Sequence, residues 1–338
     1  MKAVVHDRYG SPDLLEVREV DPPVVADDEV LVRVRAASVH PDVWHVVTGR
    51  PYVLRLMGSG LRRPKRRIPG TDVAGTVESV GRNVTRFQPG DEVFGETVRG
   101  YQWRNGGAFA EYVAIPADVL ARKPAGVSFE AAAAVPTSGL ISLQNIRPEQ
   151  RLRPGRSVLV NGAGGGVGAF AVQIAKAAGA TVTGVDHPAK LDLVRSLGAD
   201  QVIDYTKEDF TRRGERYDLI IDVPGNHPFS DCRRALTDGG TYVLIGHDQF
   251  GTAGLRVLGS LPRFLGLAVR SIFVRQLPGL SLSLPPKREL MAVLARHLEA
   301  GELTPVIDRT FPLDQVPQAL HYLMAGEVRG KVVIVVPG

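Results

Sequence analysis

The chain has 338 residues, of which 44% are hydrophobic and 23% charged, as in a folded globular protein of about two domains. This composition excludes a disordered, collagen-like or coiled-coil chain. The net charge of +5 is mildly basic, and the single cysteine, Cys232, excludes an internal disulfide and any metal site with two cysteine ligands.

The first 120 residues predict a small barrel or sandwich of short β-strands. Residues 2–6, 14–20 and 29–36 are rich in Val and Leu, and turn-forming stretches separate them. Residues 72–80 alternate small or apolar with polar side chains, which is the period of a half-buried strand. Glycine and proline punctuate the series, as is typical of all-β domains.

From about residue 129 the pattern changes to alternating helices and strands. An alanine-rich helix is predicted at 129–143, and further helices follow at 167–178, 189–197 and 229–236. The strands predicted between and around them lie at 157–161, 181–185, 201–204, 219–222 and 241–245. This alternation predicts a parallel sheet with helices on both faces.

The last part of the chain predicts a return to the first domain. Residues 267–275 predict one more strand, at the edge of the parallel sheet, and 285–303 predict a helix. A final strand at 331–336 would join the first domain. We therefore expect residues 1–130 and 280–338 to form one domain and residues 131–279 to form a second domain inserted into it.

The glycine-rich segment that follows the strand at 157–161 is the strongest motif. It runs directly into a helix, which is the context of a dinucleotide fingerprint. Backbone N–H groups at a helix N-terminus can face a pyrophosphate when no side chains intervene. The alternative is a tight packing turn. The predicted cofactor-binding residues here are Gly162, Ala163, Gly164, Gly165, Gly166, Val167 and Gly168.

Asp186 ends the next predicted strand, eighteen residues after Gly168. A carboxylate at this place commonly accepts both ribose hydroxyls of NAD and repels a 2′-phosphate. Lys190 and His187 lie close in sequence and could offset its charge. The cofactor is therefore NADH or NADPH, with Asp186 favouring NADH, and a solvated loop aspartate is the alternative.

Four segments together resemble the medium-chain dehydrogenase/reductase superfamily. They read PGTDVAGTVESVG, QPGDEVFG, AGGGVG before a helix, and SLGADQVIDYTKEDF. The resemblance covers nearly the whole chain. It implies an α/β fold in which a Rossmann doubly wound parallel sheet is inserted into a GroES-like, mainly-β catalytic domain.

The chain departs from the zinc alcohol dehydrogenases of that superfamily. Ala37 and Ser38 lie near the expected ligand cysteine, and Thr71 stands where a ligand histidine would be, with Asp72 at the acidic position. Residues 95–107 contain no cysteine. Without soft ligands a tetrahedral zinc site cannot be assembled here. The chain thus resembles the zinc-independent quinone oxidoreductase branch, and we expect no metal.

The resemblance implies hydride transfer from NAD(P)H to a quinone or an α,β-unsaturated carbonyl. Without a Lewis acid, alcohol oxidation at neutral pH is hard, whereas an electrophilic acceptor needs mainly orientation and donors to the developing oxyanion. Two alternatives stay open. One is an alcohol or aldehyde dehydrogenase of the same superfamily, and the other is a non-catalytic NAD(P)H-binding sensor.

The resemblance also suggests residues of the substrate cleft. Tyr52 matches a cleft tyrosine of the quinone oxidoreductases, and His40 stands where that branch usually carries asparagine. His40 could donate to a carbonyl oxygen as a catalytic residue with Tyr52, or be a packed imidazole. Trp44 could stack on a flat quinone or belong to the core.

Three further residues are expected at the cofactor. Thr137, followed by Ser138, matches the helix start near the nicotinamide end in this family, and Lys331 resembles a basic residue that reaches the pyrophosphate. Gly246 follows a strand at the carboxyl edge of the parallel sheet, where ligands bind. Ordinary structural roles are the alternative for each.

Partners and location follow from weaker signals. The basic run at 62–67 is interpreted as a solvated loop, so we expect a small-molecule substrate and no nucleic acid. No signal peptide and no uninterrupted apolar span is present, which predicts a cytoplasmic protein without a membrane partner. An edge strand at 267–275, together with the resemblance, predicts a homodimer.

Overall fold

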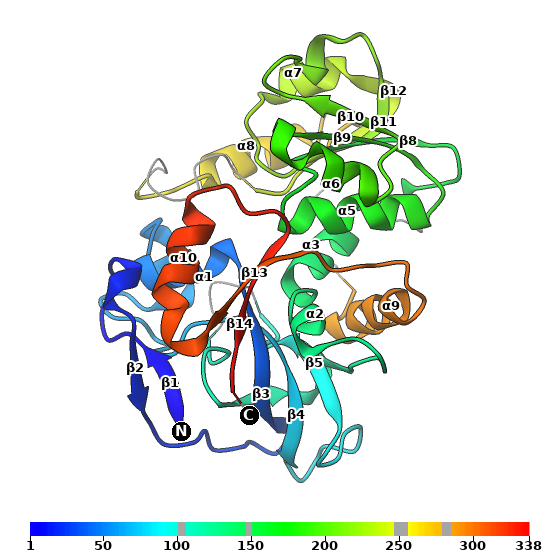
Figure 1. Ribbon diagram of the computed structural model, residues 1–338. Coiled ribbons are helices and arrows are strands. Elements are labelled where there is room, and N and C mark those ends of the chain that lie inside the picture. Colours follow the sequence, from blue (N-terminus) through cyan, green and yellow to red (C-terminus); the bar gives the residue numbers. More distant parts are fainter. Residues whose placement is uncertain (101–105, 147–150, 247–255, 279–284, 338) are drawn as a thin grey trace.

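The computed structural model describes residues 1–338 except 101–105, 147–150, 247–255, 279–284 and 338. It has two parts, each built around its own sheet (Figure 1). A seven-stranded mixed sheet is formed by the N-terminal segment and the C-terminal strands. A five-stranded parallel sheet is formed by residues between them.

The seven-stranded sheet has the order β13-β14-β3-β4-β5-β7, with β6 also paired to β3. Its strands are β3 (Glu29–Val39), β4 (Asp72–Val80), β5 (Glu92–Glu96), β6 (Tyr112–Pro116), β7 (Leu120–Arg122), β13 (Ile307–Pro312) and β14 (Lys331–Val335). Along β3, buried Val30, Val32 and Val34 alternate with more exposed residues, so one face of the strand packs on the core. A separate hairpin pairs β1 (Lys2–Val5) with β2 (Glu16–Glu19).

Two helices pack against one face of this sheet and share a hydrophobic core with it. They are α1 (Pro41–Thr48) and α10 (Val316–Met324), and both contribute buried side chains to the cluster that contains Val32 and Phe109. Short helical turns connect the strands: η1 (Pro12–Leu14), η2 (Arg55–Ser59), η4 (Ala117–Val119) and η7 (Leu313–Gln315). The mainly-β catalytic domain that the resemblance implied is therefore present.

The parallel sheet has the strand order β10-β9-β8-β11-β12. Its strands are β8 (Ser157–Asn161), β9 (Thr181–Asp186), β10 (Gln201–Asp204), β11 (Tyr217–Asp222) and β12 (Leu236–Leu244). The chain first builds outward from β8 through β9 to β10 and then continues at β11 on the other side of β8. This reversal places a crevice at the carboxyl ends of β8 and β11, where ligands bind in doubly wound sheets.

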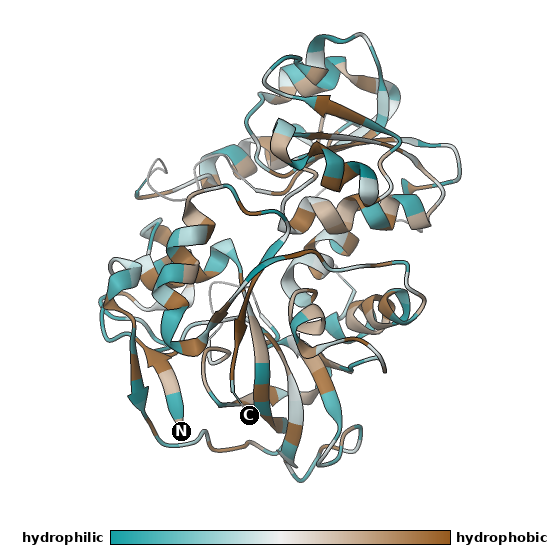
Figure 2. Ribbon diagram, viewed as in Figure 1, coloured by the Kyte–Doolittle hydropathy of each residue, from teal (hydrophilic) through white to brown (hydrophobic). Residues whose placement is uncertain are grey.

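Helices lie on both faces of the parallel sheet. Val158 and Val160 belong to one hydrophobic cluster together with Phe170 of α5, whereas Leu159 belongs to the opposite cluster with Cys232 of α7. This alternation buries the strands on both sides, and Figure 2 shows hydrophobic residues concentrated on them. The helices and turns of this part are α3 (Pro136–Ile146), α5 (Gly166–Ala177), η5 (Pro188–Lys190), α6 (Leu191–Ser196), η6 (Phe210–Arg212), α7 (Phe229–Arg234) and α8 (Leu261–Arg270).

The edge strand predicted at 267–275 is wrong. The segment instead forms the end of α8 and a following series of turns, with Val274 N–H donating to Arg270 O. A short apolar run has no clear period in sequence, and here the spacing of Leu267 and Val274 lets both pack on the sheet from a helical segment. The predicted homodimer loses this strand as its contact and stays a prediction.

Other differences concern helix limits. The helix predicted at 129–143 is two helices, α2 (Phe129–Ala133) and α3, because Pro136 can begin a helix but not continue one. Helix α9 (Lys287–Glu299) lies within the predicted 285–303, and β14 confirms the predicted final strand. The elements α1, β13 and α10 were not predicted from the sequence.

One hydrophobic cluster joins the two parts. It contains Ala36 and Phe94 of the seven-stranded sheet, Leu140 of α3, Leu294 of α9 and Phe170 of α5. In the C-terminal segment β14 pairs with β3 and β13 pairs with β14, as expected for an inserted domain. The domain limits at residues 130 and 280 stay predictions.

Candidate functional site

The predicted glycine loop connects β8 to α5 as a strand–turn–helix unit. Gly162 has a φ of +81°, and Gly165 is the N-cap of α5. A Cβ on Gly168 would lie 2.0 Å from the carbonyl oxygen of Gly162, so only glycine lets the helix start this close to the loop. Ala163 and Val167 of the same loop are buried and anchor it.

The loop fits a nucleotide pyrophosphate. A Cβ on Gly164 would approach Lys190 Cβ to 2.9 Å, and one on Gly166 would approach Lys331 Cδ to 3.1 Å. The first N–H groups of α5 have no acceptor within the helix, and glycine leaves them accessible to an anion. Loop residues 162–168 would therefore hold the phosphates of a nicotinamide cofactor.

Asp186 lies at the end of β9 and braces the glycine loop. Its Oδ2 accepts a hydrogen bond from Gly164 N–H at 2.7 Å, and its Oδ1 accepts one from His187 N–H at 2.7 Å. Each carboxylate oxygen keeps a second lone pair for a ribose hydroxyl. Lys190 Nζ, 3.4 Å from Gly326 O, is drawn toward the C-terminal segment.

The C-terminal segment reaches the glycine loop from the catalytic domain. Gly330 N–H donates to Gly164 O at 2.9 Å, and Gly330 forms a β-bridge with Gly165. Lys331 follows immediately and is 3% exposed. Its Nζ lies 3.5 Å from Asp72 Oδ2 and 3.4 Å from Ser138 Oγ. The predicted basic residue is thus inside the junction of the two domains, with its stem against Gly166.

Asp72 is the acceptor at the centre of this junction. Its carboxylate accepts hydrogen bonds from Ser38 Oγ at 2.7 Å and from Thr137 N–H at 3.0 Å. Thr137 Oγ1 lies 2.5 Å from Asp72 Oδ1 and 2.9 Å from Glu96 Oε1. The start of α3, predicted to approach the cofactor, is therefore bound to the start of β4.

Thr137 has one hydroxyl proton for two carboxylates. If it donates to Asp72, the contact with Glu96 requires a proton on Glu96. Burial, with a smaller contribution from the charge of Asp72, raises the pKa of Glu96, although Lys287 acts in the opposite direction. Lys287 Nζ contacts Glu96 Oε2 and also donates to Val98 O at 3.0 Å.

The residues at the position of the superfamily's zinc site do not fit zinc. Ser38 and Thr71 offer hydroxyls, and the carboxylate of Asp72 is already bonded to Ser38, to Thr137 and to the ammonium of Lys331. A divalent cation beside a buried ammonium would be repelled, and soft ligands are missing. In the described part of the chain, no three His, Cys, Asp or Glu side chains gather so as to hold a metal.

His40 lies at the same junction. It is the N-cap of α1, and its Nδ1 is 2.9 Å from Asp42 Oδ2. Val332 is opposite Val39 in the β14–β3 pair, so His40 borders Lys331. Burial acts to raise the pKa of Asp42, but the charges of His40, His45 and Lys331 outweigh it and leave that pKa lowered.

Tyr52 and Trp44 do not join this group. Tyr52 follows the C-terminal end of α1, whereas His40 begins it, and eight helical residues span about 12 Å. Tyr52 is 40% exposed, with the Arg55 guanidinium 4.6 Å from its ring centre. Trp44 is buried in the core of the catalytic domain, which favours packing over quinone stacking.

Gly246 lies at the carboxyl end of the parallel sheet, as predicted. Its N–H donates to Val223 O at 3.0 Å. Beside it, Asp222 accepts from Asn161 Nδ2 at 2.9 Å and from Tyr242 OH at 2.8 Å. This buried network fixes the ends of β8 and β11 around the crevice. Cys232 is buried near it, where burial and the charge of Asp222 raise the thiol pKa to about 12.

Sequence reasoning missed several residues of the junction. Asp42 carried a usable signal, because proline at N1 and an acidic residue in the first turn mark a helix start after His40. Glu96 and Lys287 lie 191 residues apart and carried no local signal. Their proximity comes only from the packing of α9 beside α3 and β7.

Comparison with known proteins agrees with this geometry. Residues 26–125 match the family described as "Alcohol dehydrogenase GroES-like domain", and residues 197–334 match "Zinc-binding dehydrogenase". Two curated relatives are the "Chloroplast envelope quinone oxidoreductase homolog" and the "NADPH-dependent alkenal/one oxidoreductase, chloroplastic", both of Arabidopsis thaliana. They are 31% and 30% identical, over 99% of this chain and 98% and 79% of theirs.

A solved structure gives the same result. The quinone oxidoreductase from Coxiella burnetii is 28% identical and superposes with a TM-score of 0.82, covering 100% of this chain and 99% of that one. The two-part fold, the glycine loop and these relatives identify the chain as a member of the medium-chain dehydrogenase/reductase superfamily, in its quinone oxidoreductase-like branch.

Proposed function

We propose that this protein is an NAD(P)H-dependent oxidoreductase that reduces a quinone or an α,β-unsaturated carbonyl. A bound reduced nicotinamide supplies the hydride. The observation that carries the proposal is the junction itself, where the glycine loop, Lys331, Asp72 and Thr137 meet. A cationic side chain is thereby held beside the loop that fits the cofactor. Two relatives of the protein are named for these two acceptor classes.

The chain's own groups would act by position and charge. Reduction of a quinone or an enone builds negative charge on the acceptor oxygen, and fixed positive charge nearby lowers the barrier. Lys331 would supply such charge from inside the junction in its protonated form, although burial lowers its pKa. His40 directs Nδ1 at Asp42, so its Nε2 is the nitrogen that points away from that carboxylate. With Nδ1–H facing Asp42, Nε2 donates only in the doubly protonated imidazolium.

Variants of the two predicted substrate residues test these roles. We expect His40→Ala to lower kcat clearly and Tyr52→Phe to lower it modestly, because His40 belongs to the junction and Tyr52 lies outside it. Steady-state kinetics with one quinone and one enone would measure both. Wild-type rates in both variants would remove the roles assigned here.

The nucleotide preference is proposed from Asp186. Its carboxylate is held against the loop by Gly164 N–H, so a 2′-phosphate there would meet a fixed negative charge. We expect a higher kcat/KM with NADH than with NADPH, and a smaller ratio in Asp186→Ser. A strong wild-type preference for NADPH, as in the relative named for that nucleotide, would contradict the assignment.

The decisive experiment combines activity with metal content. Purified protein is assayed for NAD(P)H oxidation with quinones, enones and aldehydes, and zinc is measured on the same sample. Turnover of quinones or enones without stoichiometric zinc supports the proposal. Stoichiometric zinc together with alcohol oxidation would favour the alcohol dehydrogenase alternative, and no turnover with any acceptor would favour a non-catalytic sensor.

The location of the protein in the cell is a separate question. None of the helices in the described ranges is long and apolar enough to cross a bilayer. A cytoplasmic location stays a prediction, since two relatives carry chloroplast in their names. Fractionation of cells that express the tagged chain would test it.

A further inference from the structure

Helix α8 and the turns after it carry apolar side chains on two opposite sides. On the inner side, Leu267 and Val274 pack against the hydrophobic cluster of the parallel sheet. Arg263 fixes the same side, because its guanidinium donates to Gly225 O and, at 2.6 Å, to His227 O. The helix is therefore attached to the sheet by its inner side alone, and its outer side takes no part in this attachment.

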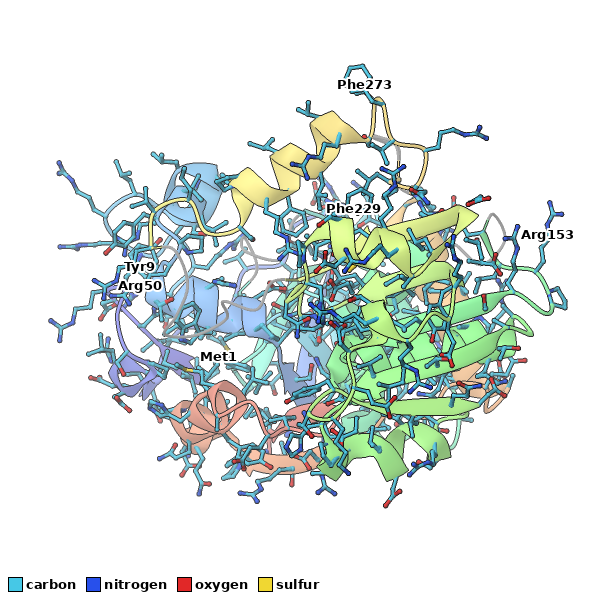
Figure 3. All side chains as sticks on the ribbon, turned by 90° about the horizontal axis from the view of Figure 1, so that it is seen from above. Met1, Tyr9, Arg50, Arg153, Phe229 and Phe273 are labelled. Atoms are coloured by element: carbon cyan, nitrogen blue, oxygen red, sulfur yellow. The ribbon has the colours of Figure 1, made fainter. Side chains whose placement is uncertain are left out.

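The outer side carries a stripe of exposed apolar residues. Leu265, Val269, Ile272 and Phe273 are 62%, 60%, 68% and 82% exposed. Leu265 and Val269 lie one turn apart on α8, and Ile272 and Phe273 follow in the turn after its last residue, Arg270. Phe273 projects away from the molecule in Figure 3. Single exposed apolar residues need no explanation, but a continuous stripe marks an interaction surface.

A second segment extends this surface. Tyr52 N–H donates to Arg256 O at 2.8 Å and Val53 N–H to Val257 O at 2.9 Å, so residues 51–53 lie alongside the chain that leads into α8. In Figure 3, Phe273 lies at the top of the molecule and Arg50 at its left. Further apolar side chains are exposed on them, namely Leu56, Leu61, Val257 and Leu258. We call residues 50–67 and 256–278 together the basic apolar face.

The charged residues of this face are all basic. It holds eleven of the 41 lysines and arginines of the chain and none of the 36 acidic residues, so the remainder carries 30 basic against 36 acidic residues. Three of the eleven are engaged locally: Arg67 with Asp7, Arg263 with backbone carbonyls, and Arg55 with Gly49 O. Seven others on this face are exposed: Arg62, Arg63, Lys65, Arg66, Arg256, Arg270 and Arg275.

The exposed apolar stripe and the positive charge together indicate which partner binds the basic apolar face. A second copy of the chain, meeting this face by two-fold symmetry, would set its cations against the same cations. A nucleic acid would satisfy the charge but would leave the aliphatic stripe in water. An anionic bilayer offers phosphates for the arginines and an acyl boundary for the stripe, which is how interfacial helices bind.

We propose that the basic apolar face docks this protein peripherally on membranes that contain anionic lipid. The stripe on α8 and in the turn after it inserts at the level of the headgroups, and the surrounding arginines and lysine contact lipid phosphates. The sequence alone predicts no membrane partner, and the exposed stripe is the observation that favours one. No part of this docking depends on the reaction proposed above.

Co-sedimentation of the full-length protein with vesicles tests the proposal. We expect binding to phosphatidylcholine vesicles that contain phosphatidylglycerol, weak binding to phosphatidylcholine alone, and release as salt rises. The double variants Ile272→Ser/Phe273→Ser and Arg270→Glu/Arg275→Glu should each weaken binding by about tenfold or more, because each removes two contacts with the bilayer. Circular dichroism and NAD(P)H oxidation should stay as in the wild type.

Matched controls keep the test specific. Val24→Ser changes an apolar residue that is 92% exposed outside the face, and Arg288→Glu/Arg296→Glu reverses two exposed arginines of α9. Both should bind vesicles as the wild type does. Equal binding to neutral and anionic vesicles, or equal loss in the controls, would overturn the proposal. So would a dimer in light scattering that the α8 variants dissociate, or RNA binding without vesicle binding.

Discussion

Lys331 and Asp72 form a charged pair at the most enclosed point of the junction. Lys331 Nζ and Asp72 Oδ2 are 3.5 Å apart, and neither side chain reaches solvent appreciably. Burial lowers the pKa of Lys331, while the charges of Asp72, Asp42 and Glu96 act to raise it. Burial outweighs these charges, so the pKa of Lys331 is lowered overall. Removing one partner of the pair leaves the other uncompensated.

A double-mutant cycle tests this pair. We expect Lys331→Met to lower the free energy of unfolding by about 3–5 kcal/mol, because a buried carboxylate loses its cation. Urea titration measures the loss. Adding Asp72→Asn to Lys331→Met should cost less than the sum of the two single variants. Additive costs would mean that the two groups do not interact and that packing alone explains their positions.

The glycine loop shows how an element depends on one missing side chain. Gly168→Ala would place a Cβ 2.0 Å from Gly162 O, so the first turn of α5 must move away from the loop. We expect a loss of stability of about 1–3 kcal/mol, as for other overpacked sites, and weaker NAD(P)H binding. Thermal unfolding and fluorescence titration with NADH measure the two effects.

Gly239→Ala is the matched control for this element. Gly239 lies in β12, and nothing stands within 4 Å of the Cβ it would acquire. Its unfolding midpoint and nucleotide affinity should stay close to the wild type. Equal effects of the two substitutions would show that the contact between Gly168 and Gly162 does not hold the loop in shape.

Elements whose period is clear could be predicted from the sequence. The strand predicted at 72–80 coincides with β4, and the glycine loop lies between β8 and α5 as expected. Helix α8 could not, because an apolar run of that length fits strand and helix equally. Helix α1 carried readable signals, with Pro41 at its start and Gly49 in a left-handed conformation at its end.

The candidate site was predictable only where its residues are close in sequence. Residues 162–168 form one motif, and their arrangement follows from local rules. The contacts of Lys331 with Ser138 and of Lys287 with Glu96 span 193 and 191 residues, and no local pattern announces them. Such pairs are set by how the two domains pack, which depends on the whole fold.

At the scale of the whole molecule, the two domains share a core. The cluster that contains Phe94 of β5 and Phe170 of α5 is continuous through α3 and α9. A shared core makes it unfavourable for one domain to unfold alone, because its partner would expose apolar surface. The molecule should therefore unfold in a single transition.

Leu294→Ala tests that cooperativity. Leu294 is fully buried on α9 and lies so near α3 that a Cβ on Gly139 would be 2.8 Å from its Cδ2. We expect a loss of about 2–5 kcal/mol. Near-ultraviolet circular dichroism and loss of nucleotide binding should give the same lowered midpoint, while Val24→Ala stays at the wild-type value. Two separate midpoints would show that the domains unfold independently.

The last strand of the chain completes both halves of the junction. Gly330 is bonded to the glycine loop, Lys331 reaches Asp72, and Val332 pairs with Val39 of the central strand β3. During synthesis, β14 leaves the ribosome after every other strand of both sheets. Until then Ala36–Val39 of β3 lack a partner strand on one edge, and the carbonyl of Gly164 lacks the N–H of Gly330. A nascent chain therefore cannot hold a formed cofactor loop against a formed catalytic domain, so the site matures only after translation has passed residue 335.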